Sequence, residues 1–191
     1  NELGQLSHLT CLNLESNELS ELPVSFGNLK CEVINLNSNN FNVSPDCIIT
    51  MPKLKSFSIM ANNLTDLPVG IGRMKCLEIL KASKNRIQFI PNSIVHLLSL
   101  ECLWLDFNRI SALPPNFHLL KRLKVIKLEG NVDLVYPTID VVVKGAEEIL
   151  RWSRTRLETS ITARNKQIVQ SVQEVLSLVK KHRIGGRLHL S

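Results

Sequence analysis

Aliphatic residues recur along the chain in a fixed frame that repeats every 22 or 23 residues. The first copy reads Leu9-x-x-Leu12-x-Leu14-x-x-Asn17-x-Leu19-x-x-Leu22-Pro23. The frame returns at six asparagines spaced 22, 23, 23, 23 and 23 residues apart, which are Asn17, Asn39, Asn62, Asn85, Asn108 and Asn131. A proline follows six residues after each of them. Self-similarity at a fixed period predicts a stack of structural repeats.

Each repeat contains a short segment in which two apolar side chains, almost always aliphatic, flank one other residue. These pairs lie five and three residues before each asparagine: Leu12/Leu14, Ile34/Leu36, Phe57/Ile59, Leu80/Ala82, Leu103/Leu105 and Ile126/Leu128. Alternation places both members on one face of a β-strand. One such strand cannot bury its apolar face alone, so stacked strands are expected to form a parallel sheet with about 4.8 Å per repeat. The bulkier return segments lie behind the strands, which puts the sheet on the concave side of an arc.

The chain resembles the leucine-rich-repeat family over residues 1 to about 156. Its 23-residue unit ending in Leu-Pro is similar to the intracellular Ras-related group that includes Scribble, Erbin and Ras suppressor proteins. The resemblance implies an α/β solenoid with a curved parallel sheet and about six repeats in residues 1–137. The segment Leu3-Gly4-Gln5-Leu6 aligns with Phe26-Gly27-Asn28-Leu29, so an earlier repeat or cap is expected to be missing at the N-terminal end.

The pattern changes after residue 137. Val142, Ala146, Ile149 and Leu150 show helical spacing, which predicts a capping helix over residues 138–158. Residues 159–184 predict a further amphipathic helix or linker, whose apolar stripe contains Ile161, Ile168, Val172, Val175 and Val179. This helix either packs on the solenoid or binds a partner. Residues 185–191 alternate again and are interpreted as the start of a further strand or repeat.

Cysteine usage and charge refine this interpretation. The five cysteines are spread through the chain without a CxxC pair or a cluster at either end, which favours a reducing, cytoplasmic location. The net charge of +6 is uneven, because residues 1–52 carry −5 and residues 53–127 carry +8. Such asymmetry steers the approach of a charged partner.

Two sets of polar and aromatic positions require separate interpretations. The six framing asparagines are interpreted as a structural ladder, because an amide side chain can satisfy backbone groups where each strand turns. The concave face is the predicted partner-binding surface, with Trp104 as its unusual exposed aromatic residue. Aromatic and arginine side chains dominate binding hot spots. The candidate residues are Trp104, Phe107, Arg109, Arg86, Lys84, Lys81, Asp106, Lys127 and Met60. In the alternative, Phe107 folds under its loop as core and Trp104 only shields its neighbours.

The sequence contains no Gly-rich phosphate loop, HExxH, GxSxG or paired-carboxylate motif, and its five histidines stand singly. We therefore expect a non-enzymatic protein with no cofactor, no metal and no small-molecule substrate. The leading hypothesis is an intracellular signalling scaffold or adaptor that binds a protein, such as a small GTPase, another signalling protein or an acidic segment. The alternative is a targeting or regulatory arm of a larger GTPase, kinase or phosphatase complex. Nucleic-acid or membrane contact through the basic tail is a third hypothesis, although a solvated helix face explains that tail more simply.

Overall fold

The computed structural model describes residues 8–185 of the 191-residue chain, with side chains through residue 177. The chain divides into two units, which meet between Arg154 and Thr155. Among the described residues, the first unit contains the six strands, and the second contains the later part of a long helix.

Six short parallel strands form one sheet in chain order, as the repeat pattern predicts. They are β1 (Cys11–Asn13), β2 (Val33–Asn35), β3 (Ser56–Ser58), β4 (Ile79–Lys81), β5 (Cys102–Trp104) and β6 (Val125–Lys127). The register aligns equivalent positions of neighbouring repeats, so Ile34 pairs with Phe57 and Leu80 pairs with Leu103. The predicted parallel sheet is therefore confirmed, together with its register.

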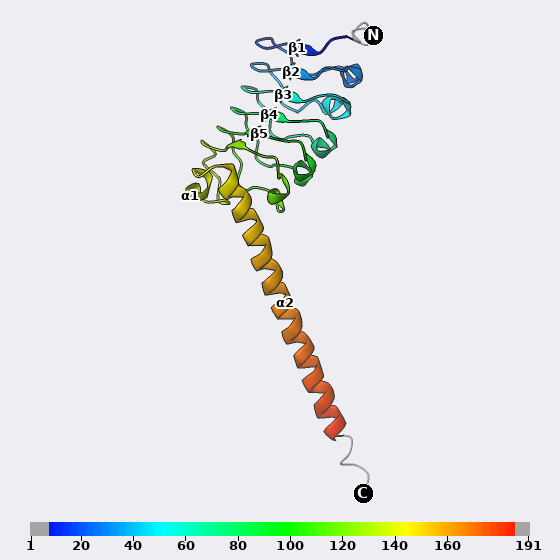
Figure 1. Cartoon of the computed structure of the whole chain (residues 1–191), viewed down its shortest axis with the longest axis vertical. Coiled ribbons are helices and arrows are strands. Elements are labelled where there is room, and N and C mark those ends of the chain that lie inside the picture. Colours follow the sequence, from blue (N-terminus) through cyan, green and yellow to red (C-terminus); the bar gives the residue numbers. More distant parts are fainter. Residues whose placement is uncertain (1–7, 186–191) are drawn as a thin grey trace. The chain divides into compact units, whose positions relative to one another are not determined.

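The return half of five repeats contains a short 3-10 helix. These are η2 (Val24–Asn28), η3 (Asp46–Thr50), η4 (Ile71–Arg73), η5 (Asn92–His96) and η6 (Phe117–Leu119). The recurring proline directly precedes three of them, where its fixed φ holds an extended residue at the turn. Figure 1 shows the 3-10 segments gathered along one side of the stacked repeats and the strands along the other. Because the helical turns need more room than strands, the sheet occupies the concave side.

The core lies between the strands and the returns. Leu80 and Leu103 have no exposed surface, which confirms that the flanking aliphatic residues of each strand point inward. Leu12 and Leu14 are only partly buried, because β1 is the first strand of the described sheet and has a neighbour on one side only.

Two helices follow the last strand, α1 (Ile139–Val142) and α2 (Ala146–Gly185). Val142, Ala146 and Ile149 are buried in the same core as the strands, so the predicted helical cap is present. The sequence pattern predicts two segments divided at residue 158, whereas the structure has a single helix from Ala146 to Gly185. No glycine or proline occurs between these two residues to interrupt it. The strand predicted for residues 185–191 lies almost entirely outside the described residues.

Candidate functional site

The framing asparagines bind the backbone of adjacent repeats. Asn85 is buried, and its Nδ2 donates to the carbonyls of Ile59 at 2.9 Å and Ala82 at 3.1 Å. Its Oδ1 accepts the N–H of Leu64 at 3.0 Å. Equivalent bonds are made at Asn39, Asn62, Asn108 and Asn131. Asn17 is exposed and donates only within its own turn. These side chains hold successive turns together, which leaves the strand face as the candidate site.

Three residues after the end of each of the first five strands, one residue adopts a left-handed conformation with φ between 53° and 57°. The members of this column are Ser16, Ser38, Ala61, Lys84 and Phe107. Interstrand hydrogen bonds hold the conformation; for example, the N–H of Phe107 donates to the carbonyl of Glu129 at 2.7 Å. A bulky side chain in this region costs roughly 1–2 kcal/mol. Lys84 and Phe107 therefore occupy positions that favour smaller residues.

Phe107 is 57% exposed, so it is not a core residue beneath its loop. Its ring lies against the backbone of Gly130, where an added Cβ would approach the ring to 2.6 Å. The glycine in the next turn therefore makes room for the aromatic ring. Strained side chains concentrate at functional sites, which is a reason to keep Phe107 among the candidates.

Trp104 lies between two lysines on the neighbouring strands of the concave face. The register aligns Lys81 of β4, Trp104 of β5 and Lys127 of β6. The two Nζ atoms lie 4.2 Å and 3.8 Å from the centre of the indole ring. Cations over an aromatic face attract its negative quadrupole. The buried Nε1 of Trp104 has no hydrogen-bond partner, so the cations are the polar contacts seen at this ring.

A groove of about 330 Å³ runs over this face of the sheet. Its lining residues are Glu15, Asn37, Ser38, Met60, Ala61, Ser83, Lys84, Trp104, Asp106 and Lys127. Five of the nine predicted site residues are among them: Met60, Lys84, Trp104, Asp106 and Lys127. Lys81 does not line the groove, but its Nζ lies over the ring of Trp104, which does. Arg86, Arg109 and Phe107 are exposed and lie outside the lining. The structure thus brings together the lysine, tryptophan and acidic positions, but not the two arginines.

Hydrogen bonds between neighbouring repeats order the floor of the groove. Asn35 Nδ2 donates to Glu15 Oε2 at 2.9 Å. The Ser58 hydroxyl donates to Asn37 Oδ1 at 2.7 Å, and the Ser83 hydroxyl donates to Asp106. Groups that are already held in place lose less conformational freedom when a ligand binds. The groove is therefore a preorganised polar surface with one large aromatic side chain.

One column of this face was not predicted from the sequence. The first residue of each strand also points away from the core; Val33 is 38% exposed and Val125 is 43% exposed. The sequence could have indicated this column, because these residues lie two positions before the column that contains Trp104. Side chains two positions apart in a strand lie on the same face. They extend the face with apolar surface.

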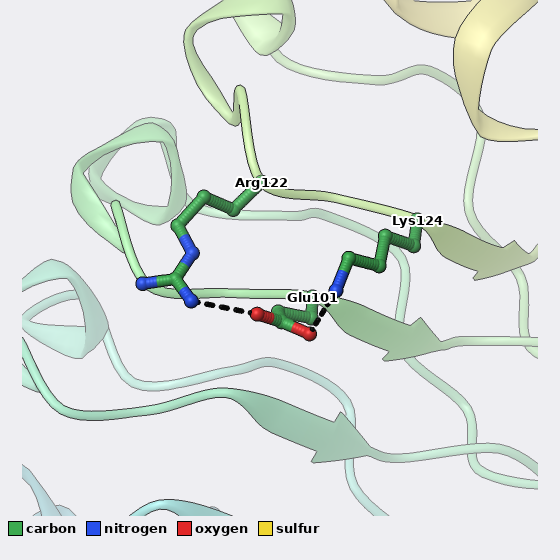
Figure 2. Close-up of polar contacts among 3 residues, drawn as sticks. All are labelled: Glu101, Arg122 and Lys124. Atoms are coloured by element: carbon green, nitrogen blue, oxygen red, sulfur yellow. Dashed lines mark hydrogen bonds and ion pairs between the residues drawn. The ribbon is translucent and has the colours of Figure 1, made fainter.

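A second set of charges lies just before the strands. Glu101 Oε1 bonds Arg122 Nη2 at 2.8 Å, and Glu101 Oε2 bonds Lys124 Nζ at 2.7 Å (Figure 2). Hydrogen bonds from Lys124 and Arg122 lower the pKa of the Glu101 carboxyl. A similar pair, Glu32 with Lys55 at 2.8 Å, links the approaches to β2 and β3. These pairs connect adjacent repeats and do not line the groove.

Residues 8–177 contain no group of three or more His, Cys, Asp or Glu side chains that could hold a metal ion. Within residues 8–185, no helix combines the length and the hydropathy needed to cross a bilayer.

Comparisons with known proteins identify the repeats. One leucine-rich-repeat family model matches residues 52–110, and a second matches residues 8–29. Neither describes an enzyme. No curated protein sequence matches the chain.

Solved structures align with most of the solenoid. A leucine-rich-repeat protein of Leptospira interrogans is 27% identical, with a TM-score of 0.53 over 70% of this chain and 43% of its own. The PEPR1-AtPEP1 structure is also 27% identical, with a TM-score of 0.60 over 68% of this chain and 19% of that one. An internalin (inlF) of Listeria monocytogenes, 24% identical, has a TM-score of 0.59 over 66% of this chain and 36% of its own.

This chain thus spans less than half the length of each of these three structures. The family models match inside the described sheet, and the structural matches share its architecture. The strands and 3-10 returns of this chain are therefore a leucine-rich-repeat solenoid closed by a C-terminal helical cap.

Proposed function

We propose that the solenoid is a protein-binding scaffold or adaptor that holds a partner segment in the concave groove. The observation that carries the proposal is Trp104, placed between Lys81 and Lys127 beside a groove with an ordered floor. Tryptophan is among the residues that most often contribute large binding energies at interfaces. The PEPR1-AtPEP1 structure, which shares the fold, supports a binding use.

The chemistry of the groove suggests the chemistry of the partner. Lys84 and Lys127 line it together with Glu15 and Asp106, so the surface has mixed charge. A complementary segment presents acidic or mixed charges to the lysines and an apolar side chain to Trp104. Rim charges act mainly on the association rate, and salt screens them.

We further propose a cytoplasmic signalling setting, with membership of the intracellular Ras-related group and a small GTPase or other signalling protein as partner. The 23-residue period and the five free cysteines support this setting. In the alternative, the same groove attaches a regulatory or targeting arm to a larger enzyme complex.

The test compares two aromatic positions, one at the groove and one away from it. A partner captured from cell extract by the full chain is identified by mass spectrometry, and its affinity is then measured for Trp104→Ala and Phe89→Ala. Phe89 is 64% exposed and lies outside the groove lining, so it is the matched control. We expect Trp104→Ala to weaken binding by about 2 kcal/mol or more, roughly 30-fold, and Phe89→Ala to leave it unchanged.

Thermal unfolding of both variants must match the parent for the comparison to report on binding. Normal affinity for Trp104→Ala, or an equal loss for Phe89→Ala, would place the binding surface elsewhere.

A further inference from the structure

The part of helix α2 that lies in the second unit of the chain has an apolar stripe along one face. Every side chain from Glu158 to Ser177 is exposed. Ile161, Ile168, Val172 and Val175 are 50%, 54%, 52% and 58% exposed. Isoleucine and valine are weak helix formers, and most helices in proteins owe their stability to packing of an apolar face. A stripe of β-branched residues therefore requires a surface that covers it.

The spacing of this stripe is that of a coiled-coil seam. The steps from Ile161 through Asn165, Ile168 and Val172 to Val175 are four, three, four and three residues. This alternation is the a and d pattern of a heptad repeat, with Ile161, Ile168 and Val175 at d and with Asn165 and Val172 at a. Val179 continues the pattern in the sequence.

Asn165 indicates which surface covers the stripe. In a parallel, in-register coiled coil, each a position faces the same a position of the neighbouring helix. Two asparagine amides then meet, and each can donate to and accept from the other. Against an antiparallel helix or an apolar surface, the same amide would be buried without a partner, which is unfavourable.

Charge and side-chain shape favour identical helices. Residues 159–177 contain only three charged side chains, Arg164, Lys166 and Glu174, and none occupies an a or d position. Copies of the helix therefore do not repel one another along the seam. β-Branched residues at both a and d favour assemblies of more than two strands. Val169 and Leu176 lie at e positions and are 56% and 53% exposed. They widen the apolar stripe, which also favours an assembly of more than two helices.

We propose that residues 158–179 of α2 form a parallel coiled coil with the same helix in further copies of this chain. Each helix follows its own solenoid in sequence, so the assembly contains more than one groove. If the grooves bind as proposed above, a multivalent partner gains avidity without any new contact. Only this consequence, and not the assembly, rests on the proposed function.

The first experiment measures the mass of the full chain in solution by light scattering across a concentration series. We expect an integer multiple, of two or more, of the 21.5 kDa chain mass. Ile168→Glu places a charge on the seam and should give single chains. Gln170→Glu adds the same charge at an f position, on the opposite side of the helix, and should leave the assembly intact. A single-chain mass for the parent at every concentration overturns the proposal, as do equal masses for the two variants.

The second experiment tests orientation and register. Asn165→Asp and Asn165→Lys each place like charges opposite one another in a parallel coil, so either variant alone should dissociate. Their mixture should reassociate, because opposite charges then meet. A mixture no more associated than either variant alone overturns the parallel register.

Two other coverings of the stripe have distinct outcomes, and each overturns the proposal. A single-chain parent whose unfolding temperature falls in Ile168→Glu but not in Gln170→Glu would assign the stripe to the chain's own solenoid. If the parent is a single chain that sediments with anionic phospholipid vesicles, and Ile168→Glu no longer does, the stripe would be assigned to a membrane surface.

Discussion

Removing one rung of the asparagine ladder tests how the repeats are held together. In Asn85→Ala, the N–H of Leu64 loses its acceptor at 3.0 Å, and the carbonyls of Ile59 and Ala82 lose donors at 2.9 Å and 3.1 Å. Leu64 is fully buried, so water cannot easily replace the missing acceptor. This single amide therefore links two successive repeats.

The expected loss follows from the groups left behind. A buried donor without an acceptor costs about 1–3 kcal/mol, and each ordinary hydrogen bond contributes about 0.5–1.5 kcal/mol. The carbonyls of Ile59 and Ala82 each keep a second donor, Asn62 Nδ2 at 3.3 Å and Asn108 Nδ2 at 3.0 Å, so neither is counted as unsatisfied. Asn85→Ala should therefore lower the free energy of unfolding by about 2–4 kcal/mol.

Asn17→Ala is the matched control. Asn17 is exposed and bonds only to the carbonyls of Leu14 and Glu15 in its own turn. Its loss should cost about 1 kcal/mol or less. Urea unfolding followed by circular dichroism measures both variants, with the slope m checked because repeat arrays can depart from two-state behaviour. A loss below about 1 kcal/mol for Asn85→Ala, or equal losses at both positions, would refute the ladder as a main link between repeats.

Two further predictions concern stability. Because its ion pairs lower the pKa of Glu101, they stabilise the fold above the carboxyl's ordinary value of 4.5, and this stabilisation is lost as pH falls through the lowered value. The urea midpoint of unfolding should thus be higher for the parent than for Glu101→Gln at pH 7, but not in strong acid. The same difference in midpoint at both pH values would contradict a stabilising role for these ion pairs. In Gly72→Ala, the new Cβ would lie 2.2 Å from a backbone carbonyl of the next repeat, whereas a Cβ at Gly145 meets nothing within 4 Å. Gly72→Ala should therefore lower the unfolding temperature further than Gly145→Ala, which bears only the cost of its positive φ, roughly 1–2 kcal/mol; the reverse order would count against this packing.

The sheet could be predicted from the sequence because each repeat has copies of itself as neighbours. Six pairs of apolar residues in one frame determine both the strand face and the register, and the structure has this register throughout. The continuous helix from Ala146 to Gly185 was harder to predict, because two separate apolar stripes suggest two elements. The absence of glycine and proline between these residues was the signal that favoured one helix.

The candidate site was only partly predictable. Alternation placed Lys81, Trp104 and Lys127 in one column, and the structure aligns them on adjacent strands. Their contact depends on side-chain torsions, because a lysine can extend into water as readily as it can fold over a ring. Position along the strand also could not separate Lys84, which lines the groove, from Arg86, which does not.

The sequence by itself determined the repeat, the inward face of every strand and the order of the strands. It did so because aliphatic spacing leaves one way to bury those side chains when equivalent units stack. Only the tertiary structure decided that Phe107 stands exposed over Gly130 and that Trp104 lies between two cations beside a groove. The physical reason is that these contacts join residues 23 positions apart through flexible side chains, whose orientation depends on the neighbours that the completed stack provides.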